Sequence, residues 1–273
     1  MTAQTPPGTR IRIGAVGYLN ARPLIYGLER SSRFVVRQDV PARCAELLHA
    51  DEIDLGLIPS IEYLRGPRTY GIVPDLAVAS YGPVASVALY TRREPRDIRS
   101  IALDTTSRTS VALTQVAAKH AFKIEPTLIP MAPDLPSMLA QADAALIIGD
   151  RALFLDHEAA GARKIDLGEL WTETTGLPFV YAFWAGRPRV VEPDDVTALR
   201  RARDEGVANV AAIARSCFPD DAGRREVVEQ YLRNNIRYSL TGAAEGLTTF
   251  YRYAAELGLV NFDGELRFYH AEL

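Results

Sequence analysis

The 273-residue sequence is poor in the residues that build disulfide frameworks and metal sites. Its two cysteines, Cys44 and Cys217, lie far apart, so neither a disulfide framework nor a cysteine-based zinc site is expected. The four histidines show neither H-x-H nor H-E-x-x-H spacing, so no metal is expected. The first ten residues lack the apolar segment of an export signal, and no run approaches the roughly 20 apolar residues of a membrane helix. The sequence therefore predicts a cytoplasmic protein without a membrane partner.

An excess of charge of one sign is also absent. The chain has 31 basic and 34 acidic residues and a net charge of −3, so no nucleic-acid partner is expected. Only Lys119, Lys123 and Lys164 are lysines, and we attribute the excess of arginine to codon usage rather than to phosphate binding. With 48% apolar and 24% charged residues, the chain is long enough for one large domain or two lobes with their own cores.

Short β-rich runs alternate with helical patterns along most of the chain, which predicts an α/β fold with parallel sheets covered by helices on both faces. Two successive runs of this kind predict two lobes, the first formed by residues 11–94 and 187–273 and the second by residues 95–186. The expected strands are 11–16, 34–40, 54–58, 76–80, 86–91, 101–103, 127–130, 144–148 and 179–184. The expected helices are 23–30, 41–50, one from residue 60, 111–122, 135–141, 194–217, 221–233 and 241–257, the last three forming a helical tail.

Ligands of such folds bind beyond the carboxyl ends of strands, so the turns after strands are the places to look for a site. Gly17 and Asn20 lie in the first such turn, where Asn20 offers a donor and an acceptor or simply caps a helix. Ser86 ends the turn 82–86 and is either a ligand contact or a strand-edge serine. No histidine lies near it and no G-x-S-x-G motif surrounds it, so a nucleophilic serine is not expected.

The turn at residues 104–110 is the richest in hydroxyl groups. It carries Thr105, Thr106, Ser107, Thr109 and Ser110 just before a helix expected to start at Val111. Such hydroxyls either cap the helix or, with its free N–H groups, form an anion site; we favour the anion site, because capping needs only one of them and a carboxylate there gains about 0.3–1 kcal/mol from the helix dipole. Arg108 either pairs with that anion or covers the surface.

Two further segments leave alternatives open. Asp150 follows the strand at 144–148 and either caps the next helix or faces the cleft. Pro178 and Phe179, in the aromatic segment from Trp171 to Phe183, either form a wall for a ring-shaped ligand or pack in the core. The sequence lacks a P-loop, a G-x-G-x-x-G motif and a spaced carboxylate pair. The pattern therefore indicates a small-anion site without an evident protein base.

Six motifs in order between residues 11 and 186 make the sequence resemble the chorismate dehydratases of the futalosine route to menaquinone. They are Val16-Gly17-Tyr18-Leu19-Asn20-Ala21-Arg22-Pro23-Leu24, Asp54-Leu55-Gly56-Leu57-Ile58-Pro59, Gly82-Pro83-Val84-Ala85-Ser86, Ser107-Arg108-Thr109-Ser110, Ala144-Ala145-Leu146-Ile147-Ile148-Gly149-Asp150 and Thr175-Gly176-Leu177-Pro178-Phe179-Val180. The helical tail fits the family in pattern but carries no such motif. The Ser-Pro-Cys-Pro-Asn-Asp motif of the sister enzyme in the pathway is absent.

The resemblance implies a periplasmic-binding-protein-like fold of type II, with two α/β lobes around a ligand cleft. It implies that chorismate loses water to form 3-[(1-carboxyvinyl)oxy]benzoate, without a cofactor. Asn20 and Ser86 are then the expected catalytic residues. The residues expected to bind substrate are Gly17, Tyr18, Leu19, Thr105, Ser107, Arg108, Thr109, Ser110, Asp150, Pro178 and Phe179.

The matched motifs contain no histidine or glutamate, so the base is the open point of the chemistry. Our hypothesis is that the enolpyruvyl carboxylate of the substrate takes the ring proton, with Asp150 as the alternative base. A non-enzymatic small-carboxylate-binding protein of the same fold is the competing function. A ligand-sensing regulator is a third, but it requires a DNA-binding segment and a basic face. No oligomeric state follows from the sequence.

Overall fold

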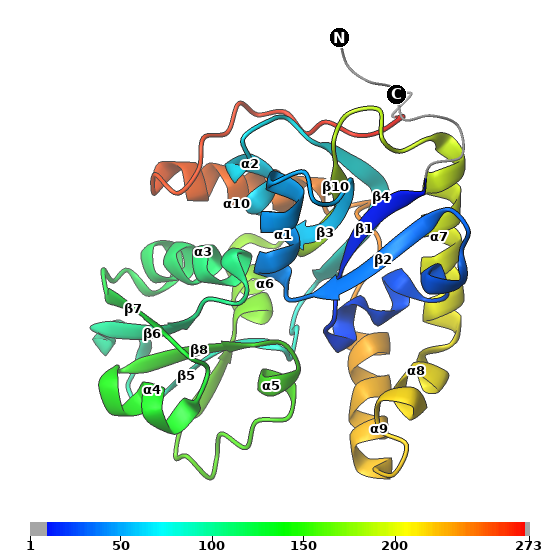
Figure 1. Ribbon diagram of the computed structural model, residues 1–273. Coiled ribbons are helices and arrows are strands. Elements are labelled where there is room, and N and C mark those ends of the chain that lie inside the picture. Colours follow the sequence, from blue (N-terminus) through cyan, green and yellow to red (C-terminus); the bar gives the residue numbers. More distant parts are fainter. Residues whose placement is uncertain (1–9, 271–273) are drawn as a thin grey trace.

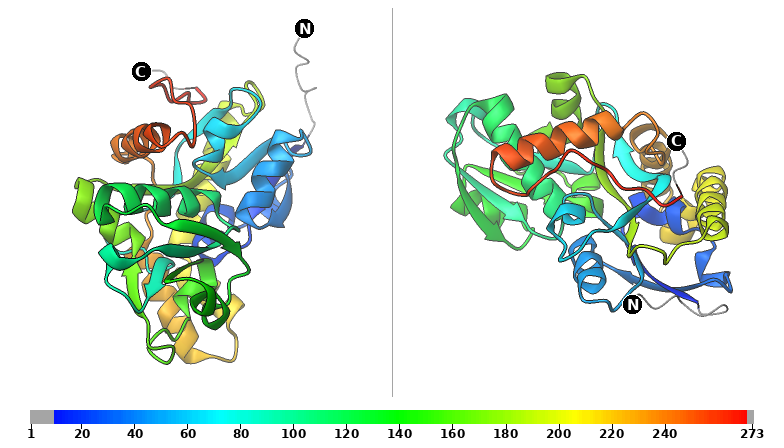
Figure 2. Two further views of the ribbon diagram at one scale, coloured as in Figure 1. Left: turned by 90° about the vertical axis from the view of Figure 1, so that its left-hand side faces the viewer. Right: turned by 90° about the horizontal axis from the view of Figure 1, so that it is seen from above.

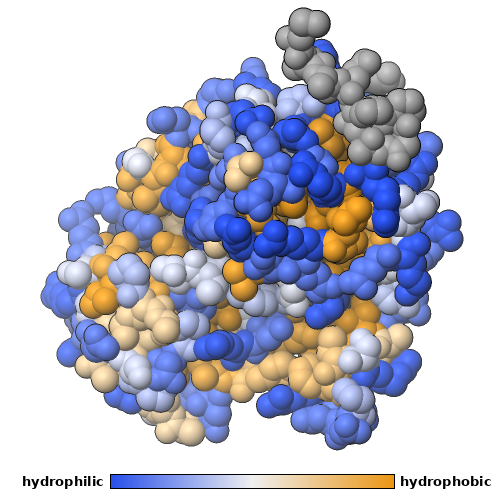
Figure 3. Space-filling model, viewed as in Figure 1, coloured by the Kyte–Doolittle hydropathy of each residue, from blue (hydrophilic) through white to orange (hydrophobic). Residues whose placement is uncertain are grey.

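The computed structural model describes residues 10–270, which form two β-sheets with helices around each (Figure 1). The expected absence of an export signal concerns residues 1–10, and all of these except Arg10 lie outside the described residues. Within the described residues, no helix is both long and apolar enough to cross a membrane. The face seen in Figure 3 mixes hydrophilic residues with smaller apolar areas.

The first sheet has the order β2-β1-β3-β10-β4 among the described residues. Its strands are β1 (Ile11–Val16), β2 (Phe34–Asp39), β3 (Leu55–Pro59), β4 (Gly71–Ser80) and β10 (Phe179–Gly186). β1 runs parallel to β2 and β3, whereas β10 runs antiparallel to β3 and β4. β10 is fully buried because it lies between two strands and is covered on both faces.

The second sheet has the order β7-β6-β8-β5-β9 in the described part of the chain. Its strands are β5 (Val87–Thr91), β6 (Ser100–Asp104), β7 (Thr127–Met131), β8 (Ala144–Ile148) and β9 (Arg163–Asp166). β6 is parallel to β7 and β8, and β5 is antiparallel to β8 and β9. Each sheet with its helices is called a lobe below, the first lobe containing β1 and the second β5.

The helices pack around these sheets, and α10 lies beside α3 (Figures 1 and 2). The α-helices are α1 (Pro41–His49), α2 (Glu62–Arg65), α3 (Arg108–Ala117), α4 (Leu135–Gln141), α5 (Gly149–Leu153), α6 (Leu167–Thr175), α7 (Pro193–Ala208), α8 (Val210–Cys217), α9 (Ala222–Gln230) and α10 (Ala244–Glu256). Short 3₁₀ segments are η1 (Leu19–Ile25), η2 (Leu28–Arg30) and η3 (Pro95–Asp97), and π-helical turns are η4 (Ala118–Phe122) and η5 (Tyr231–Asn235).

The two α/β lobes and the helical C-terminal segment are confirmed, but the expectation of all-parallel sheets is wrong. β5 and β10 run against their neighbours, and each lies just after a crossing of the chain from one lobe to the other. The sheets also divide the chain differently from the expected boundaries. β5 belongs to the second sheet and β10 to the first, so the crossings lie at residues 81–86 and 167–178.

Local signals account for further differences from the expected elements. Helix α3 begins at Arg108 instead of Val111, because Ser107 is the N-cap and its hydroxyl accepts from the Ser110 N–H. The expected helix 194–217 is interrupted at Asn209 between α7 and α8. Strand β9 and helix α6 were not expected, and β9 is an edge strand without fully buried residues.

Candidate active site

A cavity of about 490 Å³ lies between the two lobes and is lined by both. From the first lobe come residues of β1, the following turn, β3, β4 and β10, and from the second lobe come the turns around β5, α3 and β8. The lining residues are Val16, Tyr18, Asn20, Ala21, Pro41, Leu57, Pro59, Val78, Val84, Val87, Ser107, Ser110, Ile148, Gly149, Tyr181 and Ala182. It opens at strand ends, as ligand sites of α/β folds do.

The turn after β1 brings Tyr18 and Asn20 to this cavity. The Tyr18 hydroxyl donates to Thr106 Oγ1 of the second lobe at 3.2 Å. Burial raises the pKa of Tyr18, with the hydrogen bond to Thr106 acting in the opposite direction, so the hydroxyl remains a neutral donor near pH 7. Gly17 and Leu19 flank these residues without lining the cavity, and the Leu19 N–H donates to Asp150 Oδ1 at 3.0 Å.

The first turn of α3 presents two of the expected hydroxyls. Ser107 and Ser110 both line the cavity, and their Oγ atoms lie 3.1 Å apart. Thr109 points elsewhere, since its Oγ1 accepts from the Ile61 N–H at 3.2 Å. Thr105 is exposed outside the cavity lining. The helix start therefore offers the cavity two hydroxyls together with the positive end of the helix dipole.

Arg108 forms ion pairs with the first lobe instead of lining the cavity. Its Nη1 lies 2.8 Å from Glu62 Oε2, and its Nη2 lies 2.8 Å from Glu46 Oε1. The Glu62 side chain is only 2% exposed, whereas that of Glu46 is 43% exposed. Arg108 is thus a charged link between α3 and helices α1 and α2, a role that differs from both alternatives considered for it.

Asp150 makes its side-chain hydrogen bond across the cleft and does not cap a helix. Helix α5 begins at Gly149, and no side chain caps it. The Asp150 carboxylate accepts from the Leu19 N–H of the other lobe. Burial raises the pKa of Asp150, and this outweighs the lowering by the Leu19 hydrogen bond and by Arg22. The carboxylate lies beside the cavity but is not part of its lining.

Ser86 lies behind the cavity wall and is hydrogen-bonded to a tyrosine that the motifs did not reveal. Ser86 is fully buried between the lining residues Val84 and Val87, and its Oγ lies 2.7 Å from the Tyr231 hydroxyl. Tyr231 belongs to the helical tail, where the sequence offers no signal other than an aromatic residue in an amphipathic helix.

Partly buried charged groups hold the turn before Ser86 in an unusual conformation. Ala85 has a φ of 65°, a left-handed value that costs free energy in a residue with a Cβ. The Asp166 carboxylate accepts from the N–H groups of Val84 and Ala85 at 3.0 and 2.7 Å. Lys164 Nζ donates to the Ala85 carbonyl at 2.6 Å. These contacts, which the sequence did not reveal, fix the position of Ser86.

Pro178 and Phe179 pack away from the cavity, which decides between the two roles considered for their segment. Phe179 is fully buried, with its ring centre 5.2 Å from that of Trp171 and 4.9 Å from that of Phe250. The Pro178 carbonyl accepts from Trp171 Nε1. Of the same segment, Tyr181 and Ala182 do line the cavity.

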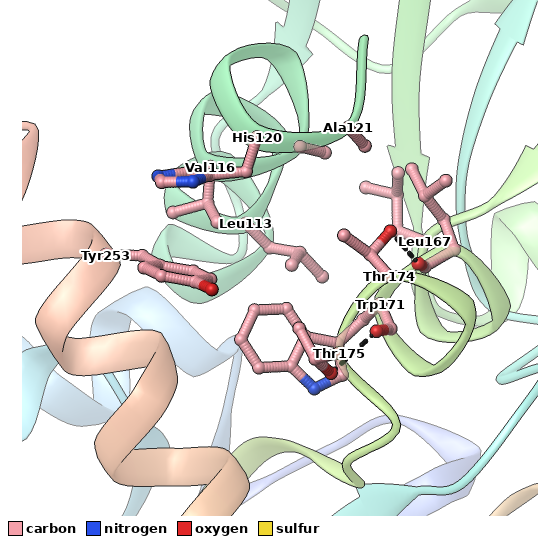
Figure 4. Close-up of a pocket in the computed structure, with 11 residues that line it drawn as sticks. Leu113, Val116, His120, Ala121, Leu167, Trp171, Thr174, Thr175 and Tyr253 are labelled. Atoms are coloured by element: carbon pink, nitrogen blue, oxygen red, sulfur yellow. Dashed lines mark hydrogen bonds between the residues drawn. The ribbon is translucent and has the colours of Figure 1, made fainter. Parts of the chain in front are cut away.

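A second pocket, of about 270 Å³, lies between α3, η4, α6 and α10 (Figure 4). Leu113, Val116 and Trp171 point into it, and the His120 ring stacks on Tyr253 with ring centres 4.0 Å apart. Its threonine hydroxyls donate to helix carbonyls one turn earlier, so they are not available to an anion. No group of three or more potential metal-ligating side chains occurs within residues 10–270. The cavity between the lobes is therefore the better candidate for an anionic substrate.

Relatives with known names match most of the chain. A family model described as menaquinone biosynthesis matches residues 11–256. A chorismate dehydratase from Thermus thermophilus is 33% identical over 244 residues, covering 84% of this chain and 89% of that protein. A chorismate dehydratase from Campylobacter jejuni is 29% identical over 176 residues, covering 62% of this chain and 64% of that protein.

Solved structures with low sequence identity share the fold. A crystal structure of an Archaeoglobus fulgidus protein has a TM-score of 0.71 at 18% identity, covering 92% of this chain and 98% of that one. A Candida albicans protein described as having the generic periplasmic binding protein fold has a TM-score of 0.65 at 11% identity, covering 94% and 93%. The fold is thus periplasmic-binding-protein-like, as the motifs implied. By its family match and its curated relatives, the chain belongs to the menaquinone biosynthesis family and, within it, to the chorismate dehydratases.

Proposed function

We propose that the cavity between the lobes binds chorismate and removes one molecule of water, giving 3-[(1-carboxyvinyl)oxy]benzoate for menaquinone biosynthesis. The observation that carries this assignment is the convergence on one cavity of Asn20 from the first lobe and the Ser107 and Ser110 hydroxyls from the second. Chorismate carries two carboxylates, and the start of α3 suits one of them. A biosynthetic role of this kind agrees with the cytoplasmic location expected from the sequence.

The chemistry needs a proton acceptor and stabilisation of negative charge, and it needs no oxidant or reductant. The ring carbon that bears the enolpyruvyl ether loses its proton, and the resulting electron pair delocalises toward the ring carboxylate. The neighbouring hydroxyl then leaves, and the proton and the hydroxyl together make the water released. Because the product ring is aromatic, the second step is strongly downhill. Preorganised donors at the ring carboxylate lower the barrier to the first step.

The surroundings of Asp150 support the substrate's own enolpyruvyl carboxylate as the base. Asp150 does not line the cavity, and one of its oxygens already accepts from the Leu19 N–H. A substrate carboxylate held by Asn20 has direct access to the ring proton, since both belong to one molecule. In this mechanism Asn20 orients that carboxylate or assists departure of the hydroxyl, with Ser86 as its expected partner.

The location of the anion site can be tested with two serines in the same helical position. Ser110 and Ser137 are both third residues of helices, and each donates its N–H to the N-cap side chain, Ser107 in α3 and Asp134 in α4. Only Ser110 lines the cavity, and Ser137 is exposed. A hydrogen bond to a charged group is worth about 1.5–3 kcal/mol, which corresponds to at least about tenfold in affinity.

We therefore expect Ser110→Ala to weaken product binding at least about tenfold in calorimetry, and Ser137→Ala to leave it unchanged. Equal affinity in both variants would mean that the Ser110 hydroxyl does not contact the ligand. Binding of intact chorismate without turnover by the wild type would instead favour a small-carboxylate-binding protein.

A further inference from the structure

The turn that leads into β5 has a backbone conformation that favours glycine, although an alanine occupies the position. Ala85 has a φ of 65°. Of the six residues other than glycine with positive φ within residues 10–270, only Ala85 is next in sequence to a residue that lines the cavity. Val84, on one side of it, is that lining residue, and Ser86, on the other side, is the serine expected to be catalytic. Strained backbone of this kind persists where surrounding contacts impose it, and it clusters at functional sites.

Two charged side chains from the edge strand β9 supply those contacts. Lys164 and Asp166 are two residues apart in the strand, so both point to the same side of the sheet. The Asp166 carboxylate accepts from the N–H groups of Val84 and Ala85 at 3.0 and 2.7 Å. Lys164 Nζ donates to the Ala85 carbonyl at 2.6 Å. Both polar groups of the Ala85 backbone are therefore held by charged partners, which form stronger hydrogen bonds than neutral ones.

The two oxygens of Asp166 have different partners, so its effect on the turn can be separated from its effect on helix α6. Oδ1 accepts from the N–H groups of Gly168 and Glu169, as the N-cap of α6, and from that of Val84. Oδ2 accepts from the Ala85 N–H. An asparagine caps a helix about as well as an aspartate, but its Nδ2 cannot accept a hydrogen bond. Asp166→Asn should therefore keep the cap and lose the bond to Ala85.

We propose that Asp166 and Lys164 are positioning residues for the dehydration, acting by holding Ala85 in its left-handed conformation. That conformation sets the direction of the chain at Val84, in the cavity wall, and at Ser86. The proposal rests on the function assigned to the cavity above. Neither Asp166 nor Lys164 lines the cavity, so their effect reaches the substrate through the turn. A misplacement of about 1 Å at a site costs up to about a hundredfold in rate.

A second N-cap aspartate supplies a matched control, and a glycine supplies a background without the strain. Asp134 is the N-cap of α4, where its side chain accepts from the Ser137 N–H, and it does not line the cavity. Asp134→Asn therefore makes the same chemical change at the same helical position away from the cavity lining. Glycine adopts positive φ about as readily as negative φ, so in Ala85→Gly the turn depends less on Asp166.

The test measures steady-state turnover of chorismate by wild type, Asp166→Asn, Ala85→Gly, the double variant and Asp134→Asn. We expect Asp166→Asn to lower kcat by about tenfold to a hundredfold with KM changed less than about threefold. Asp134→Asn should keep the wild-type kcat. The loss of kcat caused by Asp166→Asn should be at least about fivefold smaller in the Ala85→Gly background than in wild type, because the left-handed conformation no longer carries the cost of a Cβ.

Hydrogen exchange gives a second readout that does not depend on activity. The amides of Val84 and Ala85 donate to Asp166, so the segment 82–88 should exchange faster in Asp166→Asn than in wild type. Asp134→Asn should leave exchange in this segment unchanged. Lys164→Met releases the Ala85 carbonyl of the same turn, and it replaces Asp166→Asn, with the same expectations, if that variant does not fold.

A wild-type kcat in Asp166→Asn would overturn the proposal. An equal loss of kcat in the wild-type and Ala85→Gly backgrounds would also overturn it, since an aspartate that only supports the fold gains nothing from glycine at residue 85. An inactive wild type would contradict the function assigned to the cavity, and exchange would still show whether Asp166 holds the turn. An active wild type with an equally active Asp166→Asn would contradict the positioning role alone.

Discussion

Arg108 should contribute to stability chiefly through one of its two ion pairs. Glu62 is almost completely buried and Glu46 is nearly half exposed, although both oxygens lie 2.8 Å from the guanidinium. Removing one partner of a buried pair costs about 3–5 kcal/mol, and an exposed pair is worth about 0.2–1 kcal/mol. Arg65 still reaches Glu62 at 3.3 Å, and Arg108 is itself 34% exposed. We therefore expect Arg108→Met to lower the free energy of unfolding by about 1–3 kcal/mol.

Double-mutant cycles in urea unfolding separate the two pairs. With Glu62→Gln the coupling to Arg108 should be about 1–3 kcal/mol, and with Glu46→Gln it should be below about 1 kcal/mol. Because the pairs join the two lobes, Arg108→Met should also raise KM for chorismate while kcat changes little. Equal couplings to both glutamates, or none to Glu62, would refute this reasoning about burial.

Three further predictions concern stability and reactivity. Burial raises the pKa of Cys44 to about 12. This fully buried thiol should therefore resist iodoacetamide at pH 8, while the partly exposed Cys217 reacts. Rapid labelling of Cys44 in peptide mass maps would contradict its burial. A Cβ at Gly246 would lie 1.9 Å from the Pro178 carbonyl oxygen, so Gly246→Ala should lower the free energy of unfolding in urea by about 1–3 kcal/mol. A Cβ at Gly223 on α9 meets no atom closer than 3.6 Å, so the control Gly223→Ala should leave that free energy unchanged. Burial raises the pKa of Asp75, but two hydroxyl donors and an arginine outweigh this and lower it below its ordinary 3.8. The Asp75 carboxylate therefore stabilises the fold above pH 3.8, and this stabilisation is lost as the pH falls through the lower pKa of the folded state. The difference in free energy of unfolding between wild type and Asp75→Asn should shrink on acidification. A difference that stays constant with pH would contradict the lowered pKa.

Most strands and several helices could be predicted because their signals are local. The run at β8 is apolar and ends at Gly149, and Pro41 occupies the first turn of α1. β9 and α6 were missed because their residues are mostly polar and partly exposed. Strand direction was not predictable from local pattern, since β10 is antiparallel only because the chain returns from the second lobe to reach it.

The proposed site follows the same division. The motifs placed Tyr18, Asn20 and Ser110 at a common cavity, where the structure also finds them. Arg108 could not be assigned from its motif, because its carboxylate partners lie on helices far away in sequence. Tyr231 was missed for a related reason, since its hydroxyl meets Ser86 across 145 residues of chain. Contacts of this kind depend on how the tail packs against both lobes.

The central claim is tested most directly by incubating the purified protein with chorismate, without any added cofactor, and following the products by chromatography and mass. The account predicts a product lighter by one water that has the absorbance of an aromatic enol ether. Asn20→Ala, measured beside it, should form this product far more slowly while still binding it. Intact chorismate after incubation with folded wild-type protein would contradict the account.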